Sequence, residues 1–564
     1  MGSDRMSFRT NDHQQIGLHD RLNNLTERER RMLKKSWAEP FATRIFPLID
    51  ETRFATLYCN DNDSNNNGRP NTPVNVVVGS LLLKDLVGLN DEELLESILF
   101  DTRFQHALHL TSCEEIPYSD RTPSRFRERL YRHELETGED LLKEEIERLG
   151  KEYVKLLKIH SSVNRMDSLM VSSSCKNMGR LELIYTCISN LVKAVIQVGE
   201  AAILPARLLR YAEDSNKNAV CYRMKNDEVT TRLETVTADA LHVYELCGEG
   251  FADFKEYQLL SRMLNDQTKD GQLKPNKEIS PQSLQNPSDE DATFRRKAGN
   301  QHQGYTANVV ETCGENGNII TNYDFDINRH SDAEFGAEVI KELGHQEERL
   351  VLIGDGAFAS EENFKAAEGN NIELVTTNLT GEKPPEIILD FKIEDQEIKS
   401  CPAGHAPIDC KYNEGKGQYR AHFDKPTCEG CPHREECPVT PQKRRALVRL
   451  SQSTIDRAEY AEKLSTEAYK ACARIRNGVE GVPSVLRRRY GVDDMPVRGL
   501  LRSKLWFGFK IGAINAKRVI AATLISTFFG LTGVIQELRL LLVDCFGVIH
   551  QLLVPRKLIL GVLA

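Results

Sequence analysis

The N-terminal stretch of the chain lacks the apolar core of a secretory signal and the amphipathic, Arg/Ser-rich pattern of a transit peptide. One long run without charge exists, 519–535, and it is near the lower length limit for crossing a bilayer. We expect this run to be a buried C-terminal helix rather than a membrane span. The hydrophobic tail at 521–564 would then pack on the same core or be poorly ordered. The sequence therefore predicts a cytoplasmic protein with no membrane partner.

An export signal is missing, so the 14 cysteines are expected to be reduced thiols or metal ligands rather than disulfides. Hydrophobic residues make up 40% of the chain and charged residues 28%, which is typical of a soluble globular protein. A chain of 564 residues is long enough for about three or four domains.

Positive charge is concentrated near the C-terminal end, although the whole chain has a formal net charge of −9. Residues 443–518 contain 18 Lys/Arg against 7 Asp/Glu, which leaves +11. Within this segment Arg476 and Arg487 stand about one and two helical turns from Glu480, so the three could share one helix face. Glu480 is then either an ion-pair partner or a metal ligand beside groups that bind phosphates, including the neighbouring Arg488 and Arg489.

Two further acids lie on predicted strands. Asp167 interrupts the apolar run 163–171, and an acid inside a central strand is costly unless it is paired or bound to a metal. Asp355 directly follows the apolar strand 349–354, at the strand end where α/β proteins place their sites. The alternative for Asp355 is a helix N-cap or turn residue.

The segments around these acids predict an α/β fold. Residues 303–311 and 318–324 alternate like the strands of a hairpin across a glycine turn. A helix is expected at 332–343, and 349–377 reads as a strand–helix–strand unit.

The N-terminal part is predicted to be helical. Thr72-Pro73 opens one helix, Asp91 begins a second after a glycine break, and Thr122-Pro123 opens a basic third. This arrangement resembles a helix-turn-helix DNA reader, in which Arg125 and Arg129 of the basic helix would contact DNA. A scaffold or dimerisation bundle is the alternative. The polar segment 60–68 is predicted to be a solvated loop rather than a calcium site.

Two segments are predicted to interrupt the α/β core. The first is helical to about residue 268 and continues into a polar, proline-containing stretch, 271–289, that we interpret as a linker. The second contains Cys428-x2-Cys431 and Cys437, a spacing typical of structural zinc. The fourth ligand could be Cys401 or Cys410, and further candidate ligands are His405, His422 and His433. Reduced thiols in a compact loop module are the alternative.

The three acids in this order resemble those of the DDE transposases of bacterial insertion sequences, over roughly residues 41–518. The matching motifs are Met166-Asp167-Ser168, Gly304-Tyr305, Gly354-Asp355-Gly356, Arg476-x3-Glu480, Arg498-Gly499 and Asn515-Ala-Lys-Arg518. Ala473 and Arg487 stand where that family often has Tyr and Lys.

The resemblance implies an α/β fold with an RNase H-like mixed sheet flanked by helices. The expected domains are a helical DNA-binding or assembly domain at 20–150; a catalytic core at 151–180, 290–380 and 450–520; a helical insertion and linker at 181–289; a Cys-rich, zinc-ribbon-like insertion at 381–449; and the tail at 521–564.

The resemblance also implies a DNA transposase in which Asp167, Asp355 and Glu480 hold two Mg²⁺ (or Mn²⁺) ions. Arg476 and Arg487–Arg489 would hold phosphates of the element ends and of target DNA. A homo-oligomer on paired ends, working at the bacterial nucleoid, is expected, with structural Zn²⁺ on Cys401, Cys428, Cys431 and Cys437. Two alternatives are an RNase H-like nuclease that does not join strands and an inactive, transposon-derived DNA-binding protein.

Overall fold

The computed structural model describes residues 6–8, 10–11, 20–58, 69–111, 118–160, 162–223, 226–297, 299–377, 381 and 383–528. The chain forms two compact units. The first comprises the described residues of Met1–Ser161, Ser168–Phe335 and Gly481–Leu531. The second comprises those of Ser162–Asp167 and Gly336–Glu480. The predicted loop at 60–68 and the tail after residue 528 lie outside the described residues.

The core of the fold is a mixed sheet. Its strand order is β10-β9-β3-β7-β6, and β8 also pairs with β7. Strands β10, β9 and β3 are parallel, whereas β6 and β8 are antiparallel to β7. The strands are β3 (Val163–Ser172), β6 (Thr293–Lys297), β7 (Asn300–Gly314), β8 (Gly317–Ile327), β9 (Leu350–Gly354) and β10 (Ile372–Thr376). Every residue of β9 is buried, as expected for a strand covered on both faces. The predicted α/β fold with a mixed sheet flanked by helices is confirmed.

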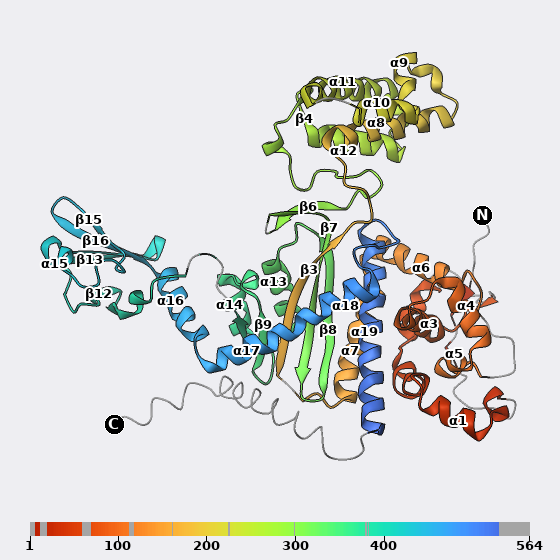
Figure 1. Cartoon of the computed structure of the whole chain (residues 1–564), viewed down its shortest axis with the longest axis horizontal. Helices are drawn as coiled ribbons and strands as arrows, with labels where there is room; N and C mark the ends of the chain where they lie inside the picture. Colours follow the sequence, from red (N-terminus) through yellow and green to blue (C-terminus); the bar gives the residue numbers. More distant parts are fainter. Residues whose placement is uncertain are drawn as a thin grey trace. The chain divides into compact units, whose positions relative to one another are not determined.

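In the first unit, α19 (Leu500–Phe528) packs against α3 (Val74–Val87), α7 (Leu141–Leu156) and β8 (Figure 1). Almost all side chains of α3 are buried, because its sequence is apolar around its whole circumference. Within α19, Val519 and Ile520 are buried, in agreement with the predicted buried helix at the start of the uncharged run. The remaining elements of this region are β1 (Met6–Ser7), α1 (Glu27–Lys34), α2 (Ala38–Pro40), β2 (Arg69–Pro70), α3 (Val74–Val87), α4 (Asp91–Phe100), α5 (Thr102–Ala107), α6 (Thr122–Thr137), α7 (Leu141–Leu156), α18 (Gly481–Tyr490) and α19 (Leu500–Phe528).

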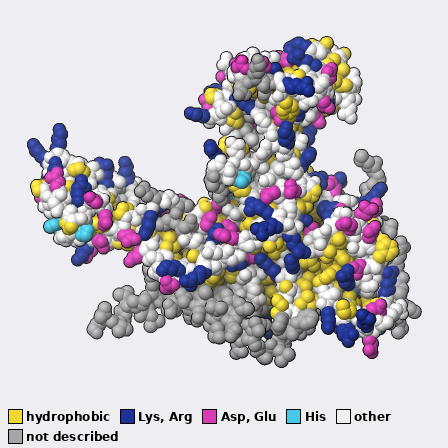
Figure 2. Space-filling view, in the orientation of Figure 1, with side chains coloured by type: hydrophobic (Ala, Val, Ile, Leu, Met, Phe, Trp, Pro, Cys, Tyr) yellow, Lys and Arg dark blue, Asp and Glu magenta, His cyan; other side chains and the backbone are white. Residues whose placement is uncertain are grey.

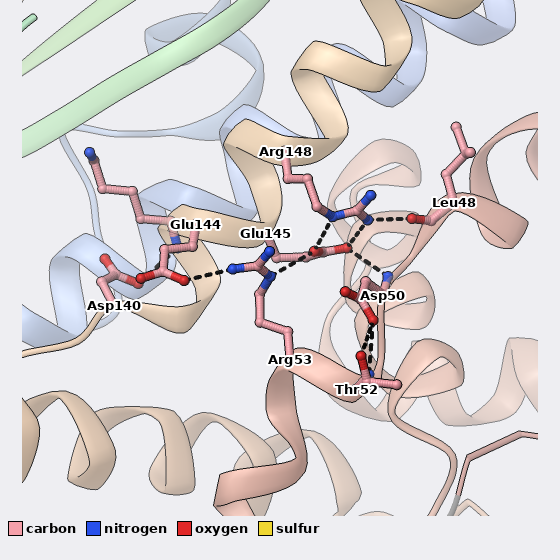
Figure 3. Close-up of polar contacts among 9 residues, drawn as sticks. Leu48, Asp50, Thr52, Arg53, Asp140, Glu144, Glu145 and Arg148 are labelled. Carbon is pink, nitrogen blue, oxygen red and sulfur yellow. Dashed lines mark hydrogen bonds and ion pairs between the residues drawn. The ribbon is translucent and has the colours of Figure 1, made fainter. Parts of the chain in front are cut away.

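A buried carboxylate on α7 joins this helix to the segment that follows Phe46 (Figure 3). The Glu145 side chain is fully buried and accepts hydrogen bonds from Arg148 Nε at 2.8 Å and from the backbone N–H of Asp50 at 2.9 Å. Arg148 also donates to the carbonyl of Leu48, while Arg53 lies between Glu145 and the half-exposed Glu144. Burial raises the pKa of Glu145, and the Arg148 guanidinium opposes this increase. The network therefore depends on every partner being present.

We expect Glu145→Ala to destabilise the first unit by about 2–3 kcal/mol, because it leaves the Asp50 N–H without its acceptor and the partly buried Arg148 guanidinium with only the Leu48 carbonyl. Its neighbour Glu144 is the matched control. That side chain is 51% exposed, so Glu144→Ala should cost less than about 1 kcal/mol. Urea unfolding of both variants measures the difference in their unfolding free energies. Equal midpoints would contradict a stabilising role for the Glu145 network.

The glycine in the Gly304-Tyr305 motif has a structural reason. Gly304 has φ +148°, and a Cβ there would lie 2.3 Å from the carbonyl oxygen of Val171 and 2.5 Å from the amide nitrogen of Ser173. The adjacent Gln303 carbonyl accepts a hydrogen bond from Ser173. Only glycine permits this close approach of β7 to the end of β3.

Gly304→Ala should therefore cost more than about 2 kcal/mol, because both the backbone angle and the contact with β3 are incompatible with a side chain. Gly317 is a matched control, since its φ is +127° but a Cβ there meets nothing within 4 Å. Thermal unfolding should show a clearly larger loss for Gly304→Ala than for Gly317→Ala. Equal losses of stability would mean that the backbone angle, and not the contact with β3, requires glycine at residue 304.

Helices of the first predicted insertion pack around a core of their own. They are α8 (Arg180–Gln197), α9 (Ala206–Leu209), α10 (Asp214–Cys221), α11 (Val229–Cys247) and α12 (Lys255–Gln267). On the face shown in Figure 2, Lys/Arg and Asp/Glu side chains are interspersed over these helices rather than gathered in one basic patch. This surface has the mixed charge of a solvated face.

The interpretation of 271–289 as a linker is wrong. This stretch includes β5 (Gln272–Leu273), which pairs with β4 (Thr268–Lys269), and it ends in buried residues. The Asp289 carboxylate accepts hydrogen bonds from the hydroxyls of Ser173 (2.5 Å) and Tyr305 (2.6 Å) and from the backbone N–H of Gly499 (3.1 Å). Polar residues that satisfy one another can be buried, and hydropathy does not detect this.

The second unit carries strands β9 and β10 and continues into a smaller antiparallel sheet with the order β13-β14-β16-β15. Its elements are α13 (Asp332–Leu343, shared with the first unit), α14 (Glu361–Gly369), β11 (Lys392–Glu394), β12 (Glu397–Ser400), β13 (Asp409–Asn413), β14 (Gln418–Asp424), α15 (Lys425–Glu429), β15 (Val439–Pro441), β16 (Arg445–Ser451), α16 (Gln452–Leu464) and α17 (Glu467–Asn477). Among the described residues, no helix has the length and apolar character needed to span a bilayer.

Candidate active site

The two candidate aspartates come from neighbouring parallel strands of the second unit. Strand β3 pairs with β9 in the register Val163↔Val351 to Arg165↔Ile353. If this register continues for two more residues, Asp167 lies opposite Asp355. Asp167 is 8% exposed, and Asp355 follows β9, where its Oδ1 accepts a hydrogen bond from the N–H of Ala357 at 2.8 Å. Asp355 is therefore an N-cap and a neighbour of Asp167 at once.

Helix α17 is fixed on the same strands by its apolar face. Cys472 is fully buried against Val163, Val351, Ile353 and Val375, with Tyr469 and Ile475 packed beside it. Hydrogen bonds hold the helical region to β10, since Tyr460 Oη donates to the Thr376 carbonyl at 2.9 Å and Tyr469 Oη donates to Glu373 at 3.3 Å. The segment that carries Glu480 is thus anchored to the strands that carry the aspartates.

One arginine on β3 fixes the end of α17. Arg165 Nη1 donates to the carbonyl of Ile475 at 2.7 Å, where a helix C-terminus carries unsatisfied carbonyls and partial negative charge. A Cβ on Gly478 would lie 2.1 Å from Arg165 Nη1. The glycine that disturbs helix periodicity therefore makes room for this guanidinium. Sequence reasoning did not find Arg165, because nothing in the local pattern links it to a partner more than 300 residues away.

Arg476 lies among all three candidate acids. Its Nη2 is 3.0 Å from Asp167 Oδ1 and 4.0 Å from Asp355 Oδ2, and its Nη1 is 2.8 Å from Glu480 Oε1. The exposed fractions of the acid side chains rise from 11% at Asp167 to 27% at Asp355 and 61% at Glu480. Three acids far apart in the sequence therefore meet around one guanidinium, with one side open to solvent.

Carboxylate oxygens are the ligands that Mg²⁺ prefers, so the chemistry of this donor set fits a divalent cation. Across the described residues, no group of three or more His, Cys, Asp or Glu side chains is arranged as a metal site, and Arg476 lies between these acids. Its buried Nε has no hydrogen-bond partner within the described part of the chain. The guanidinium is thus held mainly by the charge of the carboxylates, which a metal cation would also neutralise.

The prediction that Arg476, Glu480 and Arg487 share one helix face is wrong. Helix α17 ends at Asn477, a 3₁₀ turn covers Gly478–Glu480, and α18 begins at Gly481. Arg487 donates instead to the carbonyl of Met170 at 2.9 Å and pairs with Asp493 at 3.2 Å. Its neighbour Arg489 donates to the Leu86 carbonyl at 2.6 Å, while Arg488 is exposed. Two of these three arginines thus have partners within the first unit.

The predicted DNA contacts of the N-terminal region lie on α6. Arg125 is exposed, and Arg129 lies 4.5 Å from the ring centroid of Tyr58 as a cation–π contact. Helix α3 is buried, and this packing is what the alternative of a scaffold requires.

The predicted zinc ligands Cys401, Cys428, Cys431 and Cys437 line one pocket, together with His405 and His433. Cys410 and His422 are not among its lining residues. The Cys410 sulfur accepts a hydrogen bond from the N–H of Ile398 at 3.4 Å, and His422 pairs with Asp409 at 2.7 Å.

Comparison with known proteins gives two family matches. Residues 400–520, which include Glu480, match a family model described as "Transposase DDE domain". Residues 29–129 match a family model described as "Transposase domain (DUF772)". No curated protein matches the chain. A solved structure, the cryo-EM structure of a piggyBac transposase synaptic complex with hairpin DNA, is similar with 9% identity and a TM-score of 0.29, over 96% of this chain and 83% of that one.

Proposed function

We propose that this chain is a DDE transposase of insertion-sequence type, an enzyme that cleaves and transfers DNA strands, and that it acts on the terminal inverted repeats of its own element. The reaction would be hydrolysis at the element end, followed by in-line attack of the freed 3′-hydroxyl on target DNA. The observation that supports it is the convergence of Asp167, Asp355 and Glu480 on Arg476.

In this proposal the three carboxylates hold two Mg²⁺ (or Mn²⁺) ions. Two divalent ions supply an activated water or 3′-hydroxyl on one side of the phosphate and neutralise the leaving oxygen on the other. Asp167 and Asp355 are fixed by adjacent strands, so they would define the position of the scissile phosphate. Glu480 is mostly exposed and would complete the site from the turn after α17.

Arg476 would have two successive partners. Without a divalent ion its guanidinium neutralises the three acids, since it lies 2.8–4.0 Å from one oxygen of each. With the acids neutralised by a divalent ion, the Arg476 guanidinium would be free to bind a DNA phosphate. Arg487, Arg488 and Arg489 would contact phosphates further along the strand, with an affinity that falls as salt rises.

We assign the N-terminal helical region, 20–150, to binding DNA and to assembly, with Arg125 and Arg129 as phosphate contacts. The core segments 151–180, 290–380 and 450–520 would carry the chemistry, with 181–289 and 381–449 inserted between them. A homo-oligomer on paired element ends is part of the proposal, as is action at the nucleoid.

The proposal is tested with labelled duplexes that end in the element's inverted repeats, mixed with target DNA and Mg²⁺. Cleaved ends and joined products are expected from a transposase. Cleavage without any joined product would indicate an RNase H-like nuclease. Binding without cleavage would indicate an inactive DNA-binding protein.

A further inference from the structure

The cysteines within the described residues fall into two groups by their surroundings. Cys175, Cys187, Cys221, Cys247, Cys313 and Cys472 are buried, as structural thiols usually are. Those of the segment 401–437, by contrast, are only partly buried. Partly exposed thiols gathered in one small module are candidate metal ligands, because thiolate is a preferred soft ligand for zinc.

Four of these thiols surround one pocket of about 190 Å³ in the module that carries β11–β16. Because all four thiols line the same small pocket, they are candidates to bind one ion there.

Tight turns present the thiols to this pocket. In the first turn, the N–H of Cys401 donates to the His405 carbonyl at 2.9 Å, and the N–H of Gly404 returns to the Cys401 carbonyl at 2.8 Å. In the second region, the N–H of Arg434 donates to the Cys431 carbonyl at 3.1 Å and that of Cys437 to the His433 carbonyl at 2.9 Å. Such hydrogen-bonded turns fix the backbone next to each of these cysteines.

The module also has a physical need for a cross-link. Its apolar core is small and is built on short strands, with residues such as Phe391, Tyr419, Phe423 and Val448 at its centre. Small modules of this kind are commonly stabilised by a structural metal. Arg434 also lines the pocket, and its guanidinium would offset part of the negative charge of four thiolates around one divalent ion.

We propose that Cys401, Cys428, Cys431 and Cys437 bind one structural Zn²⁺, and that Cys410 does not. Among the described residues these side chains do not stand as a formed metal site, so binding must draw the sulfurs together and release their protons. Cys410 and His422 are excluded because neither lines the pocket that the other four cysteines share.

The test is the metal content of the full chain, purified without chelator and with a thiol reductant. About one zinc per chain is expected from elemental analysis, released on titration of the thiols with a mercurial reagent. Cys401→Ser and Cys428→Ser should lose it, while the matched control Cys410→Ser should retain it. Retention by both Cys401→Ser and Cys428→Ser, or loss by Cys410→Ser, would overturn the ligand set.

Where the serine variants do not fold, cobalt substitution of the unmodified chain provides the second measurement. A tetrahedral site with four thiolates is expected, recognised by the position and intensity of the cobalt visible absorption bands. A spectrum of mixed sulfur and nitrogen ligands would overturn the four-cysteine assignment in favour of His405 or His433. Neither measurement depends on DNA cleavage. The zinc assignment can therefore fail while the proposed function holds, and the proposed function can fail while the zinc assignment holds.

Discussion

An Asp167→Asn variant should lose Mg²⁺-dependent strand cleavage by a factor of about 10³ or more, which corresponds to about 4 kcal/mol of transition-state stabilisation. Asparagine has nearly the same shape and can still accept a hydrogen bond from Arg476, so the fold should be retained. It lacks the negative charge that a divalent ion requires. Cleavage of a labelled element-end duplex, followed over time in Mg²⁺, measures the loss.

The matched control is Glu361→Gln, which removes a carboxylate from the first turn of α14, just after Asp355 in the chain. That side chain is 74% exposed and pairs only with Lys365 among the described contacts, so its loss should leave cleavage within about twofold. If Asp167→Asn cleaved as fast as the unmodified protein, the three-carboxylate site would be rejected. An equal loss in both variants would point to a general electrostatic effect.

Replacing Arg476 by Ala should make the stability of the second unit depend on divalent cations. Without the guanidinium, three carboxylates repel one another, and we expect a loss of about 1–2 kcal/mol in chelator, discounted for the exposure of Glu480. Adding Ca²⁺ should restore most of it, because a ligand that binds only the folded state stabilises that state. Thermal unfolding in chelator and in Ca²⁺ gives both values. The unmodified protein should gain less thermal stability from Ca²⁺, since the ion must first displace Arg476.

Arg474→Ala is the control for this experiment. Arg474 is on the same helix, its side chain is 62% exposed, and it pairs with Glu467 at 3.6 Å. Its replacement should leave the response to Ca²⁺ as in the unmodified protein. If Arg476→Ala gained no more stability from Ca²⁺ than Arg474→Ala, then Arg476 would not compete with cations, and its proposed change of partners would be wrong.

Local patterns were sufficient to predict the strands that carry the aspartates. The apolar runs around Asp167 and before Asp355 are observed as β3 and β9, and the hairpin predicted at 303–324 is observed as β7 and β8. The spacing of Arg476 and Glu480 gave an ion pair as one of two alternatives, and the two side chains form an ion pair at 2.8 Å. These features depend on neighbours in the sequence, so the sequence alone could indicate them. The metal-binding roles of the acids stay a prediction.

Other features depend on pairings across the chain that no local pattern encodes. The contact of Arg165 with the Ile475 carbonyl joins residues on different elements, and it explains why Gly478 interrupts the helix. Asp289 is buried in a stretch with the composition of a linker, because distant hydroxyls and an N–H satisfy its carboxylate. For the same reason, spacing alone could not choose between Cys401 and Cys410 as a metal ligand.

The anchoring of the end of α17 by Arg165 has a consequence for how the chemistry can be switched off. The carbonyl that Arg165 holds belongs to Ile475, the residue next to Arg476, and Val479 just before Glu480 is fully buried. Because both contacts hold the turn that carries Glu480, we expect fraying of this turn to move Glu480 away from the aspartates without opening the sheet. Amide hydrogen exchange at residues 475–480 would measure the free energy of this local opening.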